Sequence, residues 1–396
     1  MPEYSTARML KGNFPIEKFE GLRTPFYYYD MELLKTTLCV VKDEMRTLPN
    51  SHMHYAVKAN FNPAILKAIA EAGFGADCVS GGEITAAINA GFKPESIFFA
   101  GVGKSDEEIN LALNYGIGRF NVESAAELRV INEIAASRGQ VAQISLRVNP
   151  DIGAHTHANI TTGLAENKFG INLEQLDDVM QLALSLPAIH YCGLHFHIGS
   201  QILDMSDFQA LCNRINNIQD EFDRRGYPLG DINVGGGLGI NYEHPNHLPI
   251  ADFNSYFGTF KKHLIRRPGQ HVHFELGRAI VAPCGSLICK VLYVKEGTHK
   301  RFAIVDGSMT ELIRPALYHA YHRIENLTSN DPEMTYDVVG PVCESSDVFA
   351  KGLVLPGCRR GDFIAIRSAG AYGESMSSGY NCHRLPVSIY EDGMDE

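Results

Sequence analysis

The feature that most constrains the fold of this chain is a repeated alternation of short apolar segments with longer amphipathic ones. Eight predicted strands lie between about residues 50 and 275, and eight is the number that closes a parallel (β/α)8 TIM barrel. An open doubly wound sheet has the same local alternation, but the fingerprint G-x-G-x-x-G expected after its first strand is absent. The alternation therefore favours the barrel. The predicted strands are 53–57, 76–79, 96–100, 119–122, 143–148, 189–197, 231–234 and 271–275, and the predicted helices are 63–71, 84–90, 106–113, 125–136, 173–186 and 208–225.

The pattern changes after Arg278, where long helical segments largely end. Short strand-like segments separated by turns predict an all-β second domain, a barrel or sandwich. The aromatic segment 25–29 is also strand-like and can join that sheet, which makes the β domain discontinuous. We therefore expect a barrel domain over residues 31–278 and a β domain over residues 1–30 and 279–396. The predicted strands of the β domain are 287–294, 302–305, 337–339, 362–366 and 387–389.

The composition excludes several classes of protein. The formal net charge of -11 opposes nucleic acid as the main partner, because phosphate binding needs a basic face. No apolar stretch is long enough to span a bilayer, and residues 1–14 lack the apolar core of a signal peptide. The nine cysteines include no C-x-x-C pair, which favours reduced thiols over a disulfide framework. We expect a cytoplasmic enzyme without nucleic-acid or membrane partners.

Reactive side chains gather at the predicted carboxyl ends of the barrel strands. These ends form one face of a (β/α)8 barrel, and the chemistry of the fold takes place there. Lys58, at the end of the first strand, is either a solvated strand end or a buried amine held for a carbonyl partner. The rest of the set favours the second interpretation. The other strand ends carry Cys78 and Ser80, Gly101, Asn121 and Glu123, Arg147 and Asn149, His195 and His197, Gly235–Gly237, and Glu275 with Arg278.

A glycine-rich turn, GGGLG at residues 235–239, follows the seventh strand. Phosphate sites in this fold often follow strands seven and eight, where bare backbone N–H groups hold an anion. A tight turn that needs positive φ angles is the alternative. Four glycines in five residues favour close approach of a ligand, and Ser200 can add a hydroxyl to the same phosphate.

Two histidines, His195 and His197, alternate on the predicted sixth strand and share one face. Metal-dependent hydrolases use such a pair, with His155 and His157 as loose further candidates. No cluster of histidine and carboxylate accompanies the pair, which favours one histidine stacking on a planar cofactor, with no metal. Glu275 ends the eighth strand, and a buried carboxylate there needs a cationic partner. That partner is either a protonated pyridine nitrogen or Arg278.

Two further groups lie beyond the barrel. Cys343 stands beside acidic residues, where it is either a packed small hydrophobe or an exposed working thiol. Arg314 and Tyr318 are four residues apart, and if Pro315 starts a helix, both can face one pocket. Arginine offers a bidentate fork for a carboxylate, and a surface salt bridge is the alternative.

Taken together, these motifs resemble the fold type III pyridoxal-phosphate-dependent decarboxylases, the group related to alanine racemase and ornithine decarboxylase. The resemblance runs from about Thr24 to Pro386. It implies a (β/α)8 barrel, a C-terminal β domain, a homodimer and pyridoxal 5′-phosphate as the cofactor. The motifs that carry it are YAVKAN at 55–60, HFHIGSQ at 195–201, GGGLG at 235–239, ELGR at 275–278, CES at 343–345 and AGAYG at 369–373.

The resemblance also implies a role for each site residue. Lys58 would be the covalent attachment point of the cofactor, His197 would stack on its ring, and Glu275 would pair with its nitrogen. Cys343 and Glu344 would reach into the site of the partner subunit. The residues implied to lie near the phosphate or the substrate are Ser200, Gly235, Gly236, Gly237, Gly277, Arg278 and Tyr372.

The expected reaction is the α-decarboxylation of meso-2,6-diaminopimelate to L-lysine and CO2, the last step of lysine biosynthesis. Cys343 is the expected proton donor to Cα. The groups expected to bind the far end of the substrate are Arg278, Arg314, Tyr318 and Tyr372 for its carboxylate and Glu344 for its ammonium. The alternatives are a decarboxylase of ornithine, arginine or carboxynorspermidine, and a catalytically silent relative that only holds the cofactor. Leu276 and Gly307-Ser308 depart from the family pattern without removing a functional side chain, and 155–168 is expected to be an ordered loop with the length of a lid.

Overall fold

The computed structural model describes residues 12–152 and 168–391. The chain divides into two compact units: a barrel unit of residues 35–240 and 251–280, and a β unit formed by the remaining residues. The segment 155–168, for which a loop is expected, lies outside the described residues except for Lys168, and so do His155 and His157.

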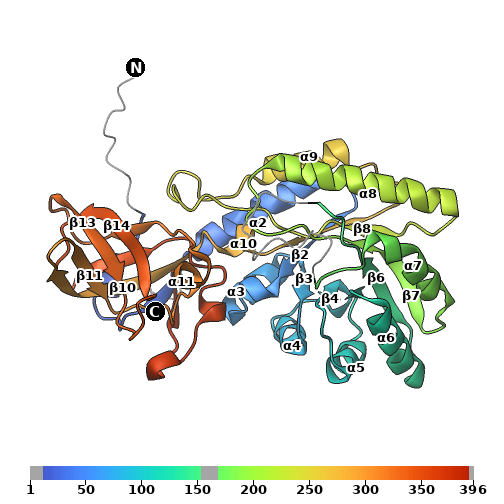
Figure 1. The fold of residues 1–396 in the computed structure, drawn as a ribbon, viewed down its shortest axis with the longest axis horizontal. Helices are drawn as coiled ribbons and strands as arrows, with labels where there is room; N and C mark the ends of the chain where they lie inside the picture. Colours follow the sequence, from blue (N-terminus) through green and yellow to red (C-terminus); the bar gives the residue numbers. More distant parts are fainter. Residues whose placement is uncertain (1–11, 153–167, 392–396) are drawn as a thin grey trace, which may run out of the picture. The chain divides into compact units, whose positions relative to one another are not determined.

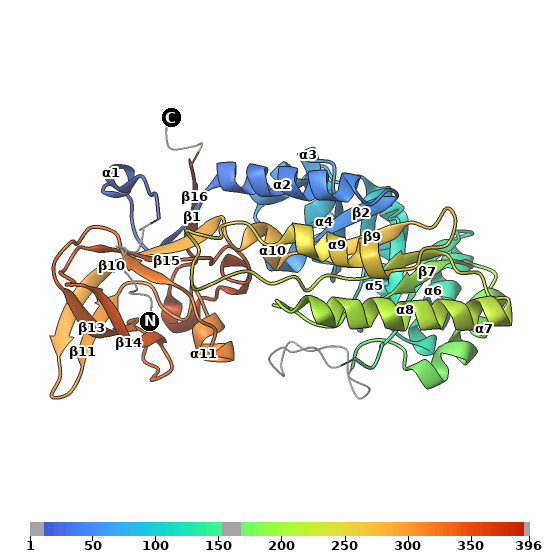
Figure 2. The same cartoon turned by 90° about the horizontal axis from the view of Figure 1, so that it is seen from above.

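The barrel unit is built on eight parallel strands, β2–β9, that close into a barrel (Figures 1 and 2). Strands β2 and β9 close it, pairing from Ser51 with Val272 to Tyr55 with Leu276. All five residues of β9 are buried, as expected for a parallel strand that is covered on both faces. Each predicted strand is present, which confirms the (β/α)8 fold class. The strands are β2 (Ser51–Ala56), β3 (Gly75–Cys78), β4 (Ile97–Phe99), β5 (Arg119–Val122), β6 (Ala142–Arg147), β7 (Ile189–His195), β8 (Asp231–Asn233) and β9 (Val272–Leu276).

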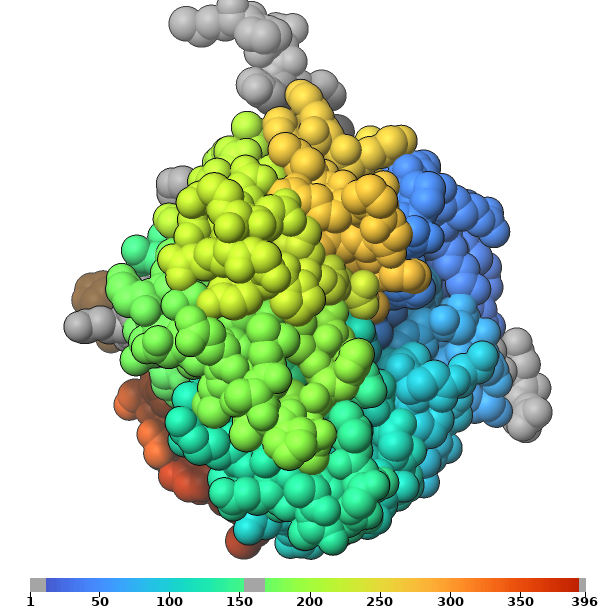
Figure 3. Space-filling view, turned by 90° about the vertical axis from the view of Figure 1, so that its right-hand side faces the viewer, coloured from blue at the N-terminus to red at the C-terminus, as the bar shows by residue number. Residues whose placement is uncertain are grey.

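Helices cover the outside of the barrel (Figures 1 and 2), and Figure 3 shows the surface of the barrel unit in colours from blue to yellow. Local signals fix where they begin. Pro63 lies in the first turn of α3, and Ser105 and Glu108 form a reciprocal capping box at the start of α5. The six predicted helices are present, whereas α2, α9 and α10 were not predicted. The helices are α2 (Met31–Arg46), α3 (Pro63–Glu71), α4 (Gly81–Asn89), α5 (Asp106–Tyr115), α6 (Ala125–Ser137), α7 (Leu176–Ser185), α8 (Met205–Arg225), α9 (Phe253–His263) and α10 (Arg278–Val281).

The β unit is an eight-stranded sheet in which six strands run in the order β12-β15-β10-β11-β13-β14. The aromatic strand β1 (Phe26–Tyr29) pairs antiparallel with β10 and parallel with β16. Phe19, Phe26 and Phe363 are buried together and form part of its core. The remaining elements are α1 (Ile16–Phe19), α11 (Arg314–Tyr318), β10 (Gly285–Glu296), β11 (Arg301–Val305), β12 (Ile324–Asn326), β13 (Glu333–Val339), β14 (Val348–Pro356), β15 (Phe363–Ile366) and β16 (Val387–Tyr390). Of these strands, β12 and β14 were not predicted.

Two general expectations can be compared with the structure. None of the nine cysteines, all of which lie in the described part of the chain, forms a disulfide. In the described part of the chain, no helix is both long enough and apolar enough to cross a membrane.

Candidate active site

Lys58 lies on a short 3-10 turn (Val57–Ala59) that directly follows β2. Its Nζ donates a hydrogen bond of 3.1 Å to Asp77 Oδ2, on the neighbouring strand β3. Asp77 is buried, and burial together with the nearby Glu275 raises the pKa of its carboxyl to about 6, although Lys58 lowers it. The lysine side chain is 38% exposed, so it is only partly buried.

Glu275, near the end of β9, is the centre of a buried hydrogen-bond network. Its Oε2 accepts from His195 Nε2 at 2.9 Å, and its Oε1 accepts from the amides of Asn121 at 3.1 Å and Asn233 at 2.6 Å. Burial favours a raised pKa, but His195 and the hydrogen bonds hold the pKa of Glu275 well below its usual range. Glu275 is therefore a carboxylate at neutral pH, with His195 rather than Arg278 as its protein partner.

His197 follows β7 and is partly buried. Burial, Arg147 and Lys58 lower its pKa well below the usual value, so the imidazole is neutral at neutral pH. Its Nδ1 accepts a hydrogen bond of 3.3 Å from the backbone N–H of Gly236, which places the ring proton on Nε2. A flat, neutral, anchored ring suits stacking on a planar ligand. No group of three or more metal-ligating side chains is arranged to hold a metal ion in the described part of the chain.

The glycine turn after β8 packs against both Glu275 and His197. Gly235 and Gly237 have φ angles of 72° and 108°, in the left-handed region that favours glycine. A Cβ on Gly236 would lie 1.8 Å from the backbone oxygen of Glu275, and a Cβ on Gly235 would lie 2.9 Å from His197 Nδ1. The turn therefore needs its glycines for backbone conformation and for close packing, which supports the tight-turn alternative.

Arg278 begins α10, directly after β9, and is buried. Its Nη2 donates to Ser200 Oγ at 2.9 Å and its Nε donates to the same oxygen at 3.3 Å. The side chain of Ser200 comes from the loop after β7, so this contact joins two neighbouring regions of the site. Gly277 packs on the Lys58 turn, because a Cβ there would lie 3.0 Å from Ala59 Cβ. A guanidinium beside a hydroxyl suits an anionic ligand such as a phosphate.

Two buried ion pairs support the same end of the barrel. Arg147 Nη1 lies 2.6 Å from Glu123 Oε1, and Lys104 Nζ lies 2.7 Å from Glu127 Oε1. Burial favours a raised pKa for Glu123, but Arg147 and Lys104 lower it, so the pair is ionised. Glu123 also accepts a backbone hydrogen bond from Gly170 at 2.8 Å. Glu123 and Arg147 lie at strand ends as predicted, and their side chains form an ion pair with each other.

The β unit carries the remaining predicted residues, beginning with α11. Pro315 lies in the first turn of this helix, as predicted. Arg314 is buried and donates to Tyr242 Oη at 2.9 Å, and its Nη1 lies 3.2 Å from His322 Nε2. The surface salt bridge considered for Arg314 is therefore wrong, because the guanidinium is inside an aromatic cluster. Tyr318 ends the same helix and is partly exposed.

Cys343 is exposed, which excludes the packed-hydrophobe interpretation within this chain. Its backbone N–H donates to Asn381 Oδ1 at 3.4 Å, and the neighbouring Glu344 accepts from Tyr380 Oη at 2.9 Å. Tyr372 has a φ of 56°, in the left-handed region where non-glycine residues are uncommon and functional residues are enriched.

Sequence reasoning missed Asp77 and Asn233, both of which contact predicted site residues. Asp77 is the third residue of β3 and Asn233 is the last residue of β8, and a polar residue within a predicted barrel strand was the available signal. Asp77 was hidden because the predicted strand end was placed at Val79. Asn233 was overlooked because the adjacent glycines formed the stronger sequence signal, which pointed to the turn and not to the strand.

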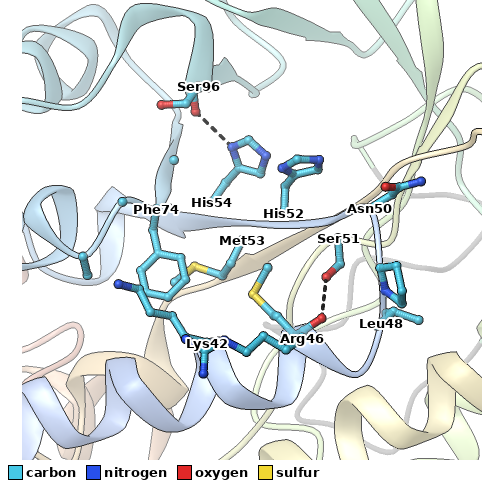
Figure 4. Close-up of a pocket in the computed structure, with 15 residues that line it drawn as sticks. Lys42, Arg46, Leu48, Asn50, Ser51, His52, Met53, His54, Phe74 and Ser96 are labelled. Atoms are coloured by element: carbon cyan, nitrogen blue, oxygen red, sulfur yellow. Dashed lines mark hydrogen bonds between the residues drawn. The ribbon is translucent and has the colours of Figure 1, made fainter.

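A second hollow lies at the opposite, amino-terminal end of β2 and is separate from this site (Figure 4). His52 and His54 point to one face of the strand, and Met53 points to the other, toward Lys42 and Arg46 of α2. His54 Nδ1 lies 3.0 Å from the backbone oxygen of Ser96. The hollow carries none of the predicted catalytic residues.

The barrel-unit residues fit pyridoxal phosphate, the cofactor implied by the motifs. This group presents an aldehyde, a flat ring with a basic nitrogen, and a phosphate. Lys58 offers an amine, His197 a neutral flat ring, and Glu275 a charged buried carboxylate. Three buried polar atoms here have no hydrogen-bond partner among the described residues, as expected where a ligand completes a site. They are Asp77 Oδ1, Asn121 Oδ1 and His195 Nδ1.

Comparisons with known proteins agree with this geometry. Residues 40–282 match the family model of the pyridoxal-dependent decarboxylases, pyridoxal binding domain. A diaminopimelate decarboxylase of Bacteroides thetaiotaomicron is 61% identical over 383 residues, covering 97% of this chain and 99% of that protein. The crystal structure of diaminopimelate decarboxylase from Helicobacter pylori complexed with L-lysine is 42% identical, with a TM-score of 0.89 over 95% of this chain and 94% of that one. A lysine/ornithine decarboxylase structure from Vibrio vulnificus, 21% identical with a TM-score of 0.80 over 95% of this chain and 96% of that one, shares the fold. The chain therefore belongs to the pyridoxal-dependent decarboxylases, and within them to the diaminopimelate decarboxylases.

Proposed function

We propose that this chain uses pyridoxal 5′-phosphate to remove one α-carboxylate of meso-2,6-diaminopimelate, releasing CO2 and L-lysine in the last step of lysine biosynthesis. The observation that carries the reaction type is Glu275, a buried carboxylate held ionised by His195, Asn121 and Asn233 beside the reactive amine of Lys58. The 61% identity to a diaminopimelate decarboxylase supports the substrate.

Each barrel residue has a role in this proposal. The cofactor supplies an electron-accepting ring that stabilises the negative charge left on Cα when CO2 departs. Lys58 would hold the cofactor through its aldehyde. Glu275 would keep the ring nitrogen protonated, and His197 would stack on the ring. Arg278 and Ser200, together with the glycine turn, would hold the phosphate.

The far end of the substrate carries both an ammonium and a carboxylate, which calls for matching charges. Arg314 is the proposed partner of the carboxylate, because its guanidinium is already desolvated and oriented by Tyr242 and His322. Ornithine has no distal carboxylate, so it offers this guanidinium no anion. Glu344, which is exposed, is the proposed partner of the ammonium.

We also propose that the enzyme is a cytoplasmic homodimer in which Cys343 and Glu344 act in the site of the opposite subunit. Cys343 would donate the proton to Cα, a role that suits an exposed thiol. Mixing inactive Lys58→Ala and Cys343→Ala subunits tests this arrangement, because a mixed dimer contains one site with both residues intact. Activity should return to about one quarter of the wild-type value if subunits exchange at random. No return of activity in a mixture proven to exchange would refute a shared site.

The test of the function is CO2 and lysine release from meso-diaminopimelate with added pyridoxal phosphate, run beside ornithine, arginine and carboxynorspermidine. Lysine formation from diaminopimelate alone, abolished in Lys58→Ala, is the expected result. Turnover of one of the other substrates instead would overturn the substrate assignment and keep the reaction type. Cofactor binding without turnover of any substrate would favour a silent relative.

A further inference from the structure

Asp77 is a buried carboxylate with no assigned role in the proposed reaction, although it holds the reactive amine. Its Oδ2 accepts the hydrogen bond from Lys58 Nζ at 3.1 Å, and its side chain is 1% exposed. Its other oxygen, Oδ1, is buried and has no hydrogen-bond partner among the residues that the structure describes. An unsatisfied acceptor on a buried carboxylate is costly to the folded protein, which indicates a function.

We propose that Asp77 is the counter-ion of Lys58 and the acceptor of its proton, a positioning residue that sets when the amine can react. The inference rests on the proposed function, in which Lys58 bonds to the cofactor aldehyde. In this step one N–H bond of the Lys58 ammonium breaks and one O–H bond forms on Asp77. A charged pair thus becomes a neutral amine and a neutral acid, and no proton leaves the site. The reverse transfer restores the pair when the substrate amine replaces Lys58.

The surroundings favour Asp77 for this role over the other acids nearby. Only an unprotonated amine attacks a carbonyl carbon, so Lys58 needs a proton acceptor within hydrogen-bond reach. Burial and the negative charge of Glu275 make proton uptake by Asp77 easier, since they raise its pKa to about 6. Glu83 has a pKa raised to about 7 by burial, but its Oε2 is bound to the backbone N–H of Val79 at 2.8 Å. The titratable groups that act electrostatically on Lys58 or Asp77 are Cys78, Glu83, His195, His197 and Glu275.

The test measures the reactivity of Lys58 directly, without turnover. The full chain, stripped of cofactor, is treated with pyridoxal phosphate and cyanoborohydride over a series of pH values. Mass spectrometry of the peptide that contains Lys58 gives the rate of labelling and its pH midpoint. In Asp77→Asn the midpoint should fall by about 1 pH unit or more, because a contacting anion stabilises the ammonium by that order. Asp231→Asn, a matched change at the other end of the barrel, should leave the midpoint where the wild type has it.

The outcomes separate this inference from the proposed function. Labelling of Lys58 with the same midpoint in Asp77→Asn and wild type would overturn the role of Asp77 alone. Labelling confined to other lysines in the wild type would overturn the proposed function itself, because Lys58 would not be the attachment point.

A second measurement covers the case in which Asp77→Asn does not fold. Lys58→Met leaves the buried Asp77 carboxylate without its cation, so adding Asp77→Asn to that variant should raise the midpoint of thermal unfolding by about 2 °C or more. If the thermal midpoint of the double variant is no higher than that of Lys58→Met, the two residues do not form an ion pair and the proposal is refuted.

Discussion

Replacing His273 with glutamine should make the barrel less sensitive to acid. His273, on β9, is buried, its Nδ1 lies 2.9 Å from His54 Nε2, and its Nε2 lies 3.4 Å from Asp231 Oδ2. His52 stacks on its ring with the centroids 5.1 Å apart. Burial lowers the pKa of His273 to about 4, even though Asp231 favours the charged form. His52 and His54 of this histidine cluster are the two seen in Figure 4.

The size of the effect follows from the two pKa values. In the unfolded chain a histidine has a pKa of about 6.5, so below that value the unfolded state binds a proton that folded His273 does not. Its contribution to stability is complete above the unfolded pKa and is lost as the pH falls toward about 4. Between about pH 7 and pH 4.5 the loss is about 2.4 kcal/mol. Asp231 stays ionised over this range, because His273 and Arg119 together outweigh burial and hold its pKa well below the usual value.

The assay is urea unfolding followed by circular dichroism at the two pH values. The wild type should lose about 2.4 kcal/mol more stability than His273→Gln between them, whatever the two proteins lose from other groups. His299→Gln, which changes an exposed histidine, is the control and should lose as much as the wild type. Equal losses in His273→Gln and wild type would refute the assignment of a neutral buried imidazole.

Three further predictions concern the active site. Glu275→Gln keeps the shape of the side chain and removes its charge, so kcat should fall by about a hundredfold or more. Absorbance should show that the variant still binds the cofactor, and a near-normal kcat would contradict the role of the carboxylate. Gly236→Ala places a Cβ 1.8 Å from the backbone oxygen of Glu275, so cofactor affinity in equilibrium titrations should fall at least about tenfold, and an unchanged affinity would refute the packing argument. Arg314→Lys replaces a planar guanidinium, which can donate two parallel hydrogen bonds to a carboxylate, by a single ammonium charge. The KM for diaminopimelate should therefore rise by about tenfold while kcat changes little. An unchanged KM would show that Arg314 does not bind the substrate.

The sequence predicted the barrel well because its strands are buried on both faces. Such strands form short apolar runs bounded by glycine, proline and polar residues, and their alternation with helices is a strong signal. The missed helix α9 (Phe253–His263) shows the limit. Its buried face is made of Phe253, Tyr256, Phe257 and Phe260, and Gly258 lies on the exposed side. Aromatic residues and glycine have low helix propensity, so the sequence pattern was weak and tertiary packing completes the helix.

The candidate site was predictable where a residue type is unusual at a strand end, as with Lys58 and Glu275. The hydrogen-bond network of the site was not predictable, because its hydrogen bonds join residues that are far apart in the sequence. The pairing of Glu275 with Asn121 spans 154 positions, and no local pattern specifies it. Arg314 was predicted as a carboxylate ligand on a helix face, but Tyr242, 72 positions earlier, orients it.

The covalent partner of the cofactor tests the central claim most directly. Holoenzyme purified from cells is reduced with borohydride, digested, and analysed by mass spectrometry for the peptide that carries the pyridoxyl phosphate group. The account predicts one modified site, Lys58, and loss of the label in Lys58→Ala. A label on another lysine, such as the buried Lys104, or a colourless protein that gains no label after incubation with the cofactor, would contradict it.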